Sequence, residues 1–352
     1  MKTSLPIASV LLAALLGAVA LAAPPSAGYH LLRKISIGGE GGWDYLTVDE
    51  QGRRVYVSHA SQVEVLDADA LKPVGKIPGT KGVHGIAIAG ELGRGFTSNG
   101  QAGTVTIFDL KTLQPVGEVA VGKNPDGIRY EPVSRRVFAL NAESNSATVI
   151  DAADGKVAAT LELGGRPEGS AVDGKGTIFI GLRDTDILLK VDAREMKIQE
   201  RWAVGVAGCP DPGNMAMDPA TRRLFIRCKD RSKTTDCCVM GVVNADNGKL
   251  IATVPIGDRA DSASFDPATR LIFFPDGNGK VTIIHEESAD RYTLVENVPT
   301  ESGARTMALD LKTHRLFLST AQSGPTPPAT AAEPNPRPPI VPGTFAVLVL
   351  SP

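Results

Sequence analysis

The stretch NPDGIRYEPVSRRVFALN, residues 124–141, decides the fold. It contains a short strand that ends in an acidic residue, then a turn, then an apolar strand that begins with arginine. Short alternating apolar runs that are separated by turn residues are typical of antiparallel β-strands. The stretch therefore predicts a β-hairpin, and the same hairpin recurs along the whole chain.

Seven copies of this hairpin can be aligned. Their first strands read DYLTVD (44–49), HGIAIA (84–89), DGIRYE (126–131), EGSAVD (168–173), GNMAMD (213–218), DSASFD (261–266) and RTMALD (305–310). Two further strands follow in each of the first six copies, and a period of 40 to 48 residues is typical of a four-stranded propeller blade. The sequence therefore predicts an all-β, seven-bladed propeller that forms a single domain over residues 23–352.

The way in which the ring closes can also be predicted. The seventh copy ends with FAVLVL (345–350) and has no fourth strand, whereas YHLLRKISIGG (29–39) has the pattern of a fourth strand. We expect the N-terminal segment to complete the last blade, which leaves no long unpaired sheet edge.

The first 22 residues indicate export. Lys2 precedes an apolar run from Ile7 to Leu21, and Ala20-Leu21-Ala22 resembles a cleavage site, so residues 1–22 are expected to be a signal peptide of a periplasmic protein. An uncleaved anchor is the alternative; after cleavage no membrane span is expected. The formal net charge of −2 gives no general reason to expect a nucleic-acid partner. Without a CxxCH motif, a covalently attached haem is excluded.

The cysteines fall in the fifth copy. Cys209 and Cys228 are both expected at the same face of this blade, which favours a disulfide between them in an exported protein. Cys237 and Cys238 would either pair with each other or compete for Cys228. A proline-rich loop, residues 322–343, is inserted in the last blade on that same face.

The repeat resembles the YncE-like, YVTN-repeat family of bacterial propellers. The resemblance rests on residues 124–141, on PEGSAVDGKGTIFIG (167–181), on GDRADSASFDPATRLIFF (257–274) and on GARTMALD (303–310). It implies a periplasmic seven-bladed propeller, and single-stranded DNA binding has been proposed for the namesake. More distant propellers of similar appearance include metal-dependent lactonases, a streptogramin lyase and the heavy subunits of periplasmic amine dehydrogenases.

Polar residues gather where the first strands begin and the second strands end, because these ends lie on the same face of a propeller. We call this set the mouth ring, and its candidate ligand-binding members are Asp44, His59, His84, Asn99, Asp126, Asn141, Glu168, Asp261 and Arg305. Several carboxylates at one opening favour a bound cation. The tentative ligands of a divalent metal are His59, His84, Asp126 and Glu168. Alternatively, the same side chains lock the ring by hydrogen bonds to neighbouring blades, or they form an acid/base set.

Three functions follow from this ring. The first is a binding or accessory protein that acts as a monomer and binds a small-molecule ligand, a divalent cation or another periplasmic protein. The second is a metal-dependent enzyme of lactonase or lyase type that uses the same mouth. The third, single-stranded nucleic-acid binding, rests on the family resemblance alone. Trp43 and Tyr45, beside Asp44, are expected to pack between blades, and His30, His285 and His314 are expected away from the mouth.

Overall fold

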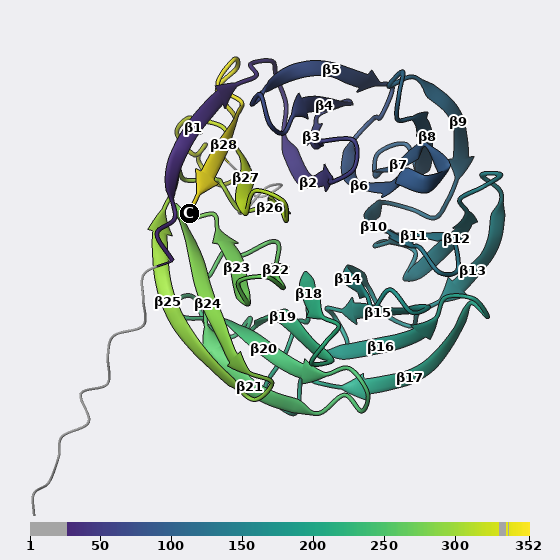
Figure 1. Ribbon diagram of the computed structural model, residues 1–352, viewed down its shortest axis with the longest axis vertical. Coiled ribbons are helices and arrows are strands. Elements are labelled where there is room, and N and C mark those ends of the chain that lie inside the picture. Colours follow the sequence, from purple (N-terminus) through teal and green to yellow (C-terminus); the bar gives the residue numbers. More distant parts are fainter. Residues whose placement is uncertain (1–26, 331–335, 337) are drawn as a thin grey trace, which may run out of the picture.

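The chain forms a closed ring of seven antiparallel four-stranded sheets (Figure 1). The computed structural model describes residues 27–330, 336 and 338–352, and the expected signal peptide, residues 1–22, lies outside this range. In each blade the first strand is nearest the axis and the fourth strand is on the outside (Figure 1). The predicted seven-bladed propeller is therefore confirmed.

The blades are numbered by their first strands. From the axis outward, the first three blades consist of β2 (Trp43–Asp49), β3 (Arg54–His59), β4 (Gln62–Asp67) and β5 (Lys72–Pro78) in blade 1; β6 (Val83–Ala89), β7 (Arg94–Asn99), β8 (Thr104–Asp109) and β9 (Pro115–Ala120) in blade 2; and β10 (Pro125–Glu131), β11 (Arg136–Asn141), β12 (Ser146–Asp151) and β13 (Val157–Glu162) in blade 3. The next two consist of β14 (Pro167–Val172), β15 (Thr177–Leu182), β16 (Ile187–Asp192) and β17 (Lys197–Ala203) in blade 4 and of β18 (Met215–Asp218), β19 (Arg223–Lys229), β20 (Cys238–Asn244) and β21 (Leu250–Pro255) in blade 5. The last two consist of β22 (Ser264–Asp266), β23 (Leu271–Asp276), β24 (Lys280–Ser288) and β25 (Arg291–Pro299) in blade 6 and of β26 (Met307–Asp310), β27 (Arg315–Thr320), β28 (Ala346–Ser351) and β1 (His30–Ser36) in blade 7. A single 3-10 turn, η1 (Gly90–Leu92), joins β6 to β7 within the described residues.

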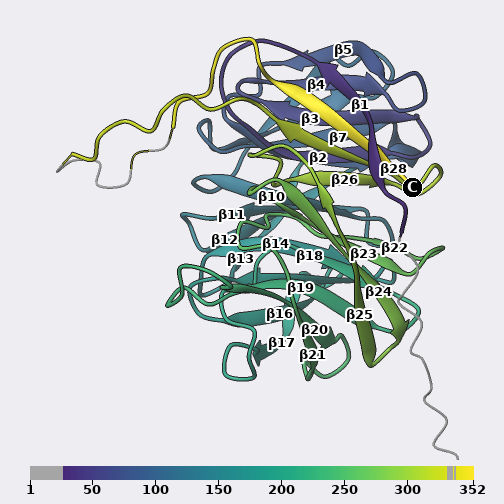
Figure 2. The ribbon, with the colours of Figure 1, turned by 90° about the vertical axis from the view of Figure 1, so that its left-hand side faces the viewer.

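Strand β1 closes the ring, as the sequence predicted. It pairs antiparallel with β28, with Ile35 opposite Val347, and the two strands lie side by side in Figure 2. Tyr29, just before β1, packs edge-on against Phe273 of blade 6 and donates a hydrogen bond to the His314 carbonyl over 2.7 Å. The N-terminal strand therefore joins blade 7 to its neighbour as well as completing its sheet.

The turns between first and second strands follow from their acidic residue. In blade 6, Asp266 accepts hydrogen bonds from the Ala268 amide at 3.0 Å and from the Thr269 hydroxyl at 2.8 Å. Arg270 then takes a positive φ of 58° before the second strand begins, and Arg222 does the same in blade 5. The Asp side chain satisfies the turn amides that the ladder leaves free. Non-glycine residues thus turn this corner.

An aromatic ring in the second strand of every blade fills the space between sheets. These fully buried residues are Tyr56, Phe96, Phe138, Phe179, Phe225, Phe273 and Phe317. Each is worth about 3–5 kcal/mol against alanine. Near the axis the blades approach so closely that only glycine fits: a Cβ on Gly127 would lie 2.6 Å from the Glu168 carbonyl oxygen, and one on Gly169 would lie 2.4 Å from the Asn214 Cα.

Two further expectations concern the disulfide and the inserted loop. Cys209 and Cys228 form a disulfide, as predicted, while Cys237 and Cys238 are free and buried. The insertion at 322–343 joins β27 to β28, and those of its residues that the structure describes extend from the ring in Figure 2. Its base is held by a bridge between Ser323 and Ile340. In the part of the chain that the structure describes, no helix has the length and apolarity needed to cross a membrane.

Candidate functional site

Three mouth-ring side chains from consecutive blades meet at His84. The Nδ1 atom of His84 lies 2.6 Å from Asp44 Oδ2 and 3.8 Å from Asp126 Oδ1. The three residues are contributed by β6, β2 and β10, and all three side chains are partly exposed. We call Asp44, His84 and Asp126 the His84 cluster. It spans two blade interfaces at the opening of the channel.

A local irregularity of the first strands presents these side chains. The pairing register with the second strand shifts between Trp43 and Leu46 in blade 1 and at the equivalent place in blades 2, 3 and 4. At this place serine hydroxyls bind the backbone amides instead of carbonyl groups of the second strand. Ser58 Oγ accepts a hydrogen bond from the Asp44 amide at 2.7 Å, and Ser98 Oγ accepts one from the Gly85 amide at 2.9 Å. Bulges of this kind often redirect side chains at binding sites.

The carboxylates of the mouth ring are electrostatically crowded. Burial, assisted by the charges of Asp44 and Glu168, raises the pKa of Asp126 to about 7. Burial and the same two charges also raise the pKa of Asp261 to about 7. Burial alone would lower the pKa of His84, but the hydrogen bond that His84 donates to Asp44 and the charge of Asp126 outweigh it, so this pKa is raised. Among the described residues, Asp126 Oδ1 has no hydrogen-bond partner. The cluster therefore holds negative charge that its own protein partners satisfy only in part.

The other mouth carboxylates have arginine partners. Glu168 lies 2.7 Å from Arg183 and 3.8 Å from Arg227, and Asp211 lies 3.1 Å from Arg183. The sequence analysis missed these arginines, although Arg183 directly follows the end of β15 and Arg227 lies one residue before Cys228, next to mouth positions. They give the blade 4–5 side of the opening a balanced charge, unlike the His84 cluster.

On the blade 6–7 side, Arg305 supplies the balancing charge. It lies 3.1 Å from Asp261, donates to the Trp43 carbonyl at 3.1 Å and stacks over the Trp43 ring. Trp43 itself is buried against Phe345, so it packs between blades as expected.

The three mouth-ring residues that end second strands, His59, Asn99 and Asn141, are buried. His59 is 2% exposed, stacks on Phe345 with 4.1 Å between ring centres, and has Nδ1 3.5 Å from Glu64. Asn99 donates to Thr106 at 2.8 Å, and Asn141 donates in the same way to Thr148 at 3.0 Å.

The structure consequently groups the candidate metal ligands differently from the tentative set. Asp44, His84 and Asp126 offer ligand atoms that all lie within 4.8 Å of one another, whereas His59 and Glu168 are not part of this group. One imidazole nitrogen and two carboxylate oxygens suit a divalent cation of intermediate softness, such as Zn²⁺ or Mn²⁺. A second such group among the described residues consists of Cys237, Cys238 and Asp258.

The remaining histidines lie away from the mouth. His314 follows β26 on the opposite face and lies 2.6 Å from Asp266 through Nδ1. It thus repeats the contact of His84 with Asp44, but in the part of the chain that is described it has no second carboxylate partner.

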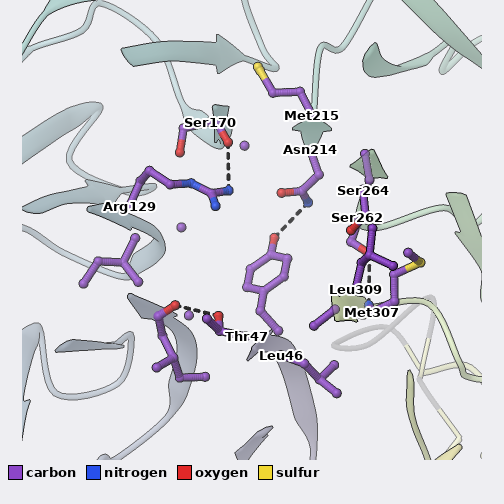
Figure 3. Close-up of a pocket in the computed structure, with 18 of the residues that line it drawn as sticks. Leu46, Thr47, Arg129, Ser170, Asn214, Met215, Ser262, Ser264, Met307 and Leu309 are labelled. Carbon is purple, nitrogen blue, oxygen red and sulfur yellow. Dashed lines mark hydrogen bonds between the residues drawn. The ribbon is translucent and has the colours of Figure 1, made fainter. Parts of the chain in front are cut away.

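Below the mouth ring the channel contains a polar cavity of about 210 Å³ (Figure 3). Tyr45, which was expected to pack between blades, instead lines this cavity, and its hydroxyl accepts a hydrogen bond from Asn214 of blade 5 over 3.0 Å. Arg129 of β10 also lines it and donates to the Ser170 carbonyl at 2.9 Å (Figure 3). Neither cavity residue was singled out as a ligand-binding candidate.

Comparisons with known proteins support the fold and leave the function open. No protein-family model matches the chain, and no curated protein matches it in sequence. In structure it is similar to a chain of the Kuenenia stuttgartiensis hydrazine synthase, with 17% identity and a TM-score of 0.67 over 79% of this chain and 92% of that one. A chain of the mitotic checkpoint complex, at 15% identity, gives a TM-score of 0.72 over 98% of this chain and 99% of that one. The RRP9 WD40 repeats, at 11% identity, give 0.71 over 93% and 99%. At such identities the likeness is one of fold: the chain is a β-propeller of the WD40-like kind.

Proposed function

We propose that this protein is a periplasmic binding propeller of the YncE type and that the His84 cluster holds a divalent cation, through which a ligand or partner protein is bound. The observation that carries the proposal is the position of His84 Nδ1 between Asp44 and Asp126, at 2.6 and 3.8 Å. The seven-bladed fold is consistent with a binding or accessory protein, because its loops can vary at one face without cost to the sheets.

The charge of the cluster favours a cation. Asp126 is an acid whose pKa is raised to about 7, and Asp44 and Glu168 contribute to that rise. A divalent cation would stabilise the ionised form of Asp126 and would give Oδ1 the partner that it lacks among the described residues. Burial of unpaired carboxylates costs free energy that cation binding would recover.

Cation binding would displace the proton from His84 Nδ1. In the cation-free protein this proton lies between His84 and Asp44, which accounts for the raised pKa of His84. A metal ligand must be unprotonated, so binding would release protons and would weaken as the pH falls. Two protein carboxylates and one imidazole leave further coordination positions for a ligand from solution.

Calorimetric titration of the purified protein, stripped with EDTA and dialysed, tests the proposal. ZnCl₂ and MnCl₂ are the probes, with MgCl₂ and CaCl₂ for comparison. At a hundredfold excess over Kd we expect about 2.7 kcal/mol of stabilisation. For residues 23–352, the chain expected after cleavage of the signal peptide, this corresponds to a rise in Tm of about 4 °C.

The matched control is the histidine on the opposite face. His84→Gln should abolish binding, whereas His314→Gln removes the equivalent contact with Asp266 and should leave it unchanged. Asp126→Asn gives an independent, isosteric loss of one ligand. The proposal is wrong if the native protein binds none of the four cations, or if both cluster variants bind as tightly as the native protein.

A further inference from the structure

The central channel holds a positive charge that has no acidic partner. Arg129 enters the cavity from β10, and its Nη2 donates a 2.9 Å hydrogen bond to the Ser170 carbonyl (Figure 3). Among the residues that the structure describes, it forms no ion pair. Burial lowers the pKa of the Arg129 guanidinium, and the only charge that opposes this effect is that of Tyr45. Nη1 and Nε of Arg129 remain available to another acceptor.

Packing of the propeller does not require an arginine at this position. The equivalent residues of the other first strands are all small: Thr47, Ala87, Ala171, Ala216, Ser264 and Ala308. The Arg129 side chain is exposed to the channel, and the surrounding first strands, all of which the structure describes, give its guanidinium no counter-charge. An anion from solution would supply that charge.

The cavity has the size and the donors for a small anion. Its volume of about 210 Å³ equals that of roughly seven water molecules at about 30 Å³ each. The Tyr45 hydroxyl uses its lone pair to accept from Asn214 at 3.0 Å, so its hydrogen is free to be donated to a ligand. A guanidinium group and a hydroxyl then face the same small space.

The surrounding charges permit an anion in this cavity. Glu168 is the one mouth-ring carboxylate that lines it, and Arg183 at 2.7 Å and Arg227 at 3.8 Å compensate that charge. Asp126 and Asp261 belong to the mouth ring and do not line the cavity. Asp261 is paired with Arg305 at 3.1 Å, so its charge is balanced at the mouth.

We infer that the central channel is a second binding site, distinct from the His84 cluster, and that it takes a small carboxylate of about the size of acetate or malonate. The planar guanidinium of Arg129 would bind the two carboxylate oxygens side by side. Tyr45 would donate a third hydrogen bond. A guanidinium can also pair with two oxygens of a tetrahedral oxyanion, so sulfate is the probe that distinguishes a carboxylate site from a general oxyanion site.

Calorimetry and thermal unfolding in the presence of EDTA test the inference without a contribution from a mouth cation. Sodium acetate and sodium malonate are the probes, with chloride and sulfate at equal ionic strength. The carboxylates should bind and raise the Tm. Arg129→Gln should weaken their binding about tenfold or more, since a charge-assisted pair is lost. Tyr45→Phe, which keeps the ring, should weaken it to a smaller extent.

Arg201→Gln is the matched control. Arg201 also donates to one backbone carbonyl, that of Leu163 at 2.7 Å, but it lies on the outer strand β17. This variant should bind carboxylates as the native protein does. The inference is overturned if the native protein binds neither carboxylate, if sulfate binds equally well, or if binding survives unchanged in Arg129→Gln. Should Arg129→Gln not fold, unchanged binding in Tyr45→Phe overturns the assigned geometry.

Discussion

Replacement of Asp126 by asparagine should stabilise the cation-free protein at alkaline pH. Asp126 is enclosed beside Asp44 and Glu168, and its Oδ1 has no hydrogen-bond partner among the described residues. Asparagine keeps the size of the side chain and removes the charge. The change should therefore relieve repulsion at the mouth without opening a cavity.

The expected magnitude follows from the pKa. The pKa of Asp126 is about 7 instead of 3.8, and each pKa unit corresponds to about 1.4 kcal/mol. The ionised carboxylate thus costs at most about 4 kcal/mol at pH 8, and because the Asp126 side chain is partly exposed, solvent screens part of the repulsion, and we expect about 2 to 4 kcal/mol. With an unfolding entropy of about 0.7 kcal/mol/K for residues 23–352, the Tm should rise by about 3 to 6 °C.

The stabilisation by Asp126→Asn should increase as the pH rises. Since the pKa is higher in the folded than in the unfolded protein, the folded state holds more protons between about pH 4 and pH 7, and native stability falls as the pH rises through this range. The advantage of Asp126→Asn should hence be largest at pH 8 and small near pH 4. Asp109, whose pKa is lowered by hydrogen bonds from Thr112, gives a control of opposite sign: Asp109→Asn should cost stability at pH 8.

Differential scanning calorimetry in EDTA at pH 4, 6 and 8 measures the effect. A Tm of Asp126→Asn at pH 8 that is equal to or below the native value would refute the reasoning, because attraction between Asp126 and His84 would then outweigh the repulsion. So would a difference that is the same at all three pH values.

Three further predictions concern the scaffold. A variant that starts at Gly41 lacks β1 and leaves β28 as an open edge, so it should lose cooperative unfolding in circular dichroism; an unchanged transition would contradict closure by β1. Cys209→Ser with Cys228→Ser opens a loop with a sequence separation of 19 and should lower the free energy of unfolding in urea by about 3 kcal/mol, and no loss would be contrary evidence. Arg53→Gln breaks a 2.6 Å ion pair with the fully buried Asp310 and should cost about 3–5 kcal/mol at pH 7. Burial opposes ionisation of Asp310, but the hydrogen bonds from Arg53 and Thr313 outweigh it and hold its pKa well below the ordinary value, so this difference should shrink as the pH falls below about 4.

The fold could be predicted because each blade repeats the same local rules. An aromatic residue fills the second strand in all seven units, and an acidic residue stands at the end of the first strand in six of them, where it satisfies the turn; blade 2 has Ala89 at this place. Even the closure could be predicted, since the strand pattern missing after residue 350 is present at 29–39. A repeat supplies seven tests of one hypothesis within a single sequence.

The contacts at the mouth could be predicted less well than the fold. The place of a residue in the repeat determines how near the channel opening it lies, but not the direction in which its side chain points. His59 and His84 occupy aligned ends of adjacent blades, yet His59 turns inward onto Phe345 while His84 reaches Asp44. Stacking on Phe345 orients His59, and the contact with the Asp44 carboxylate of the previous blade orients His84. Both depend on contacts between segments far apart in the chain.

Departures from the repeat carry more information about the site than the repeat itself. At the second position of the first strands, blades 2, 3 and 4 have glycine where blade 1 has Tyr45, and at the fourth position the other six blades have small residues where blade 3 has Arg129. A scaffold needs neither exception, since small residues serve the same positions elsewhere in the ring. Both exceptions line the same cavity. In a propeller, the residue that breaks the blade pattern near the axis is consequently the one to examine first for binding.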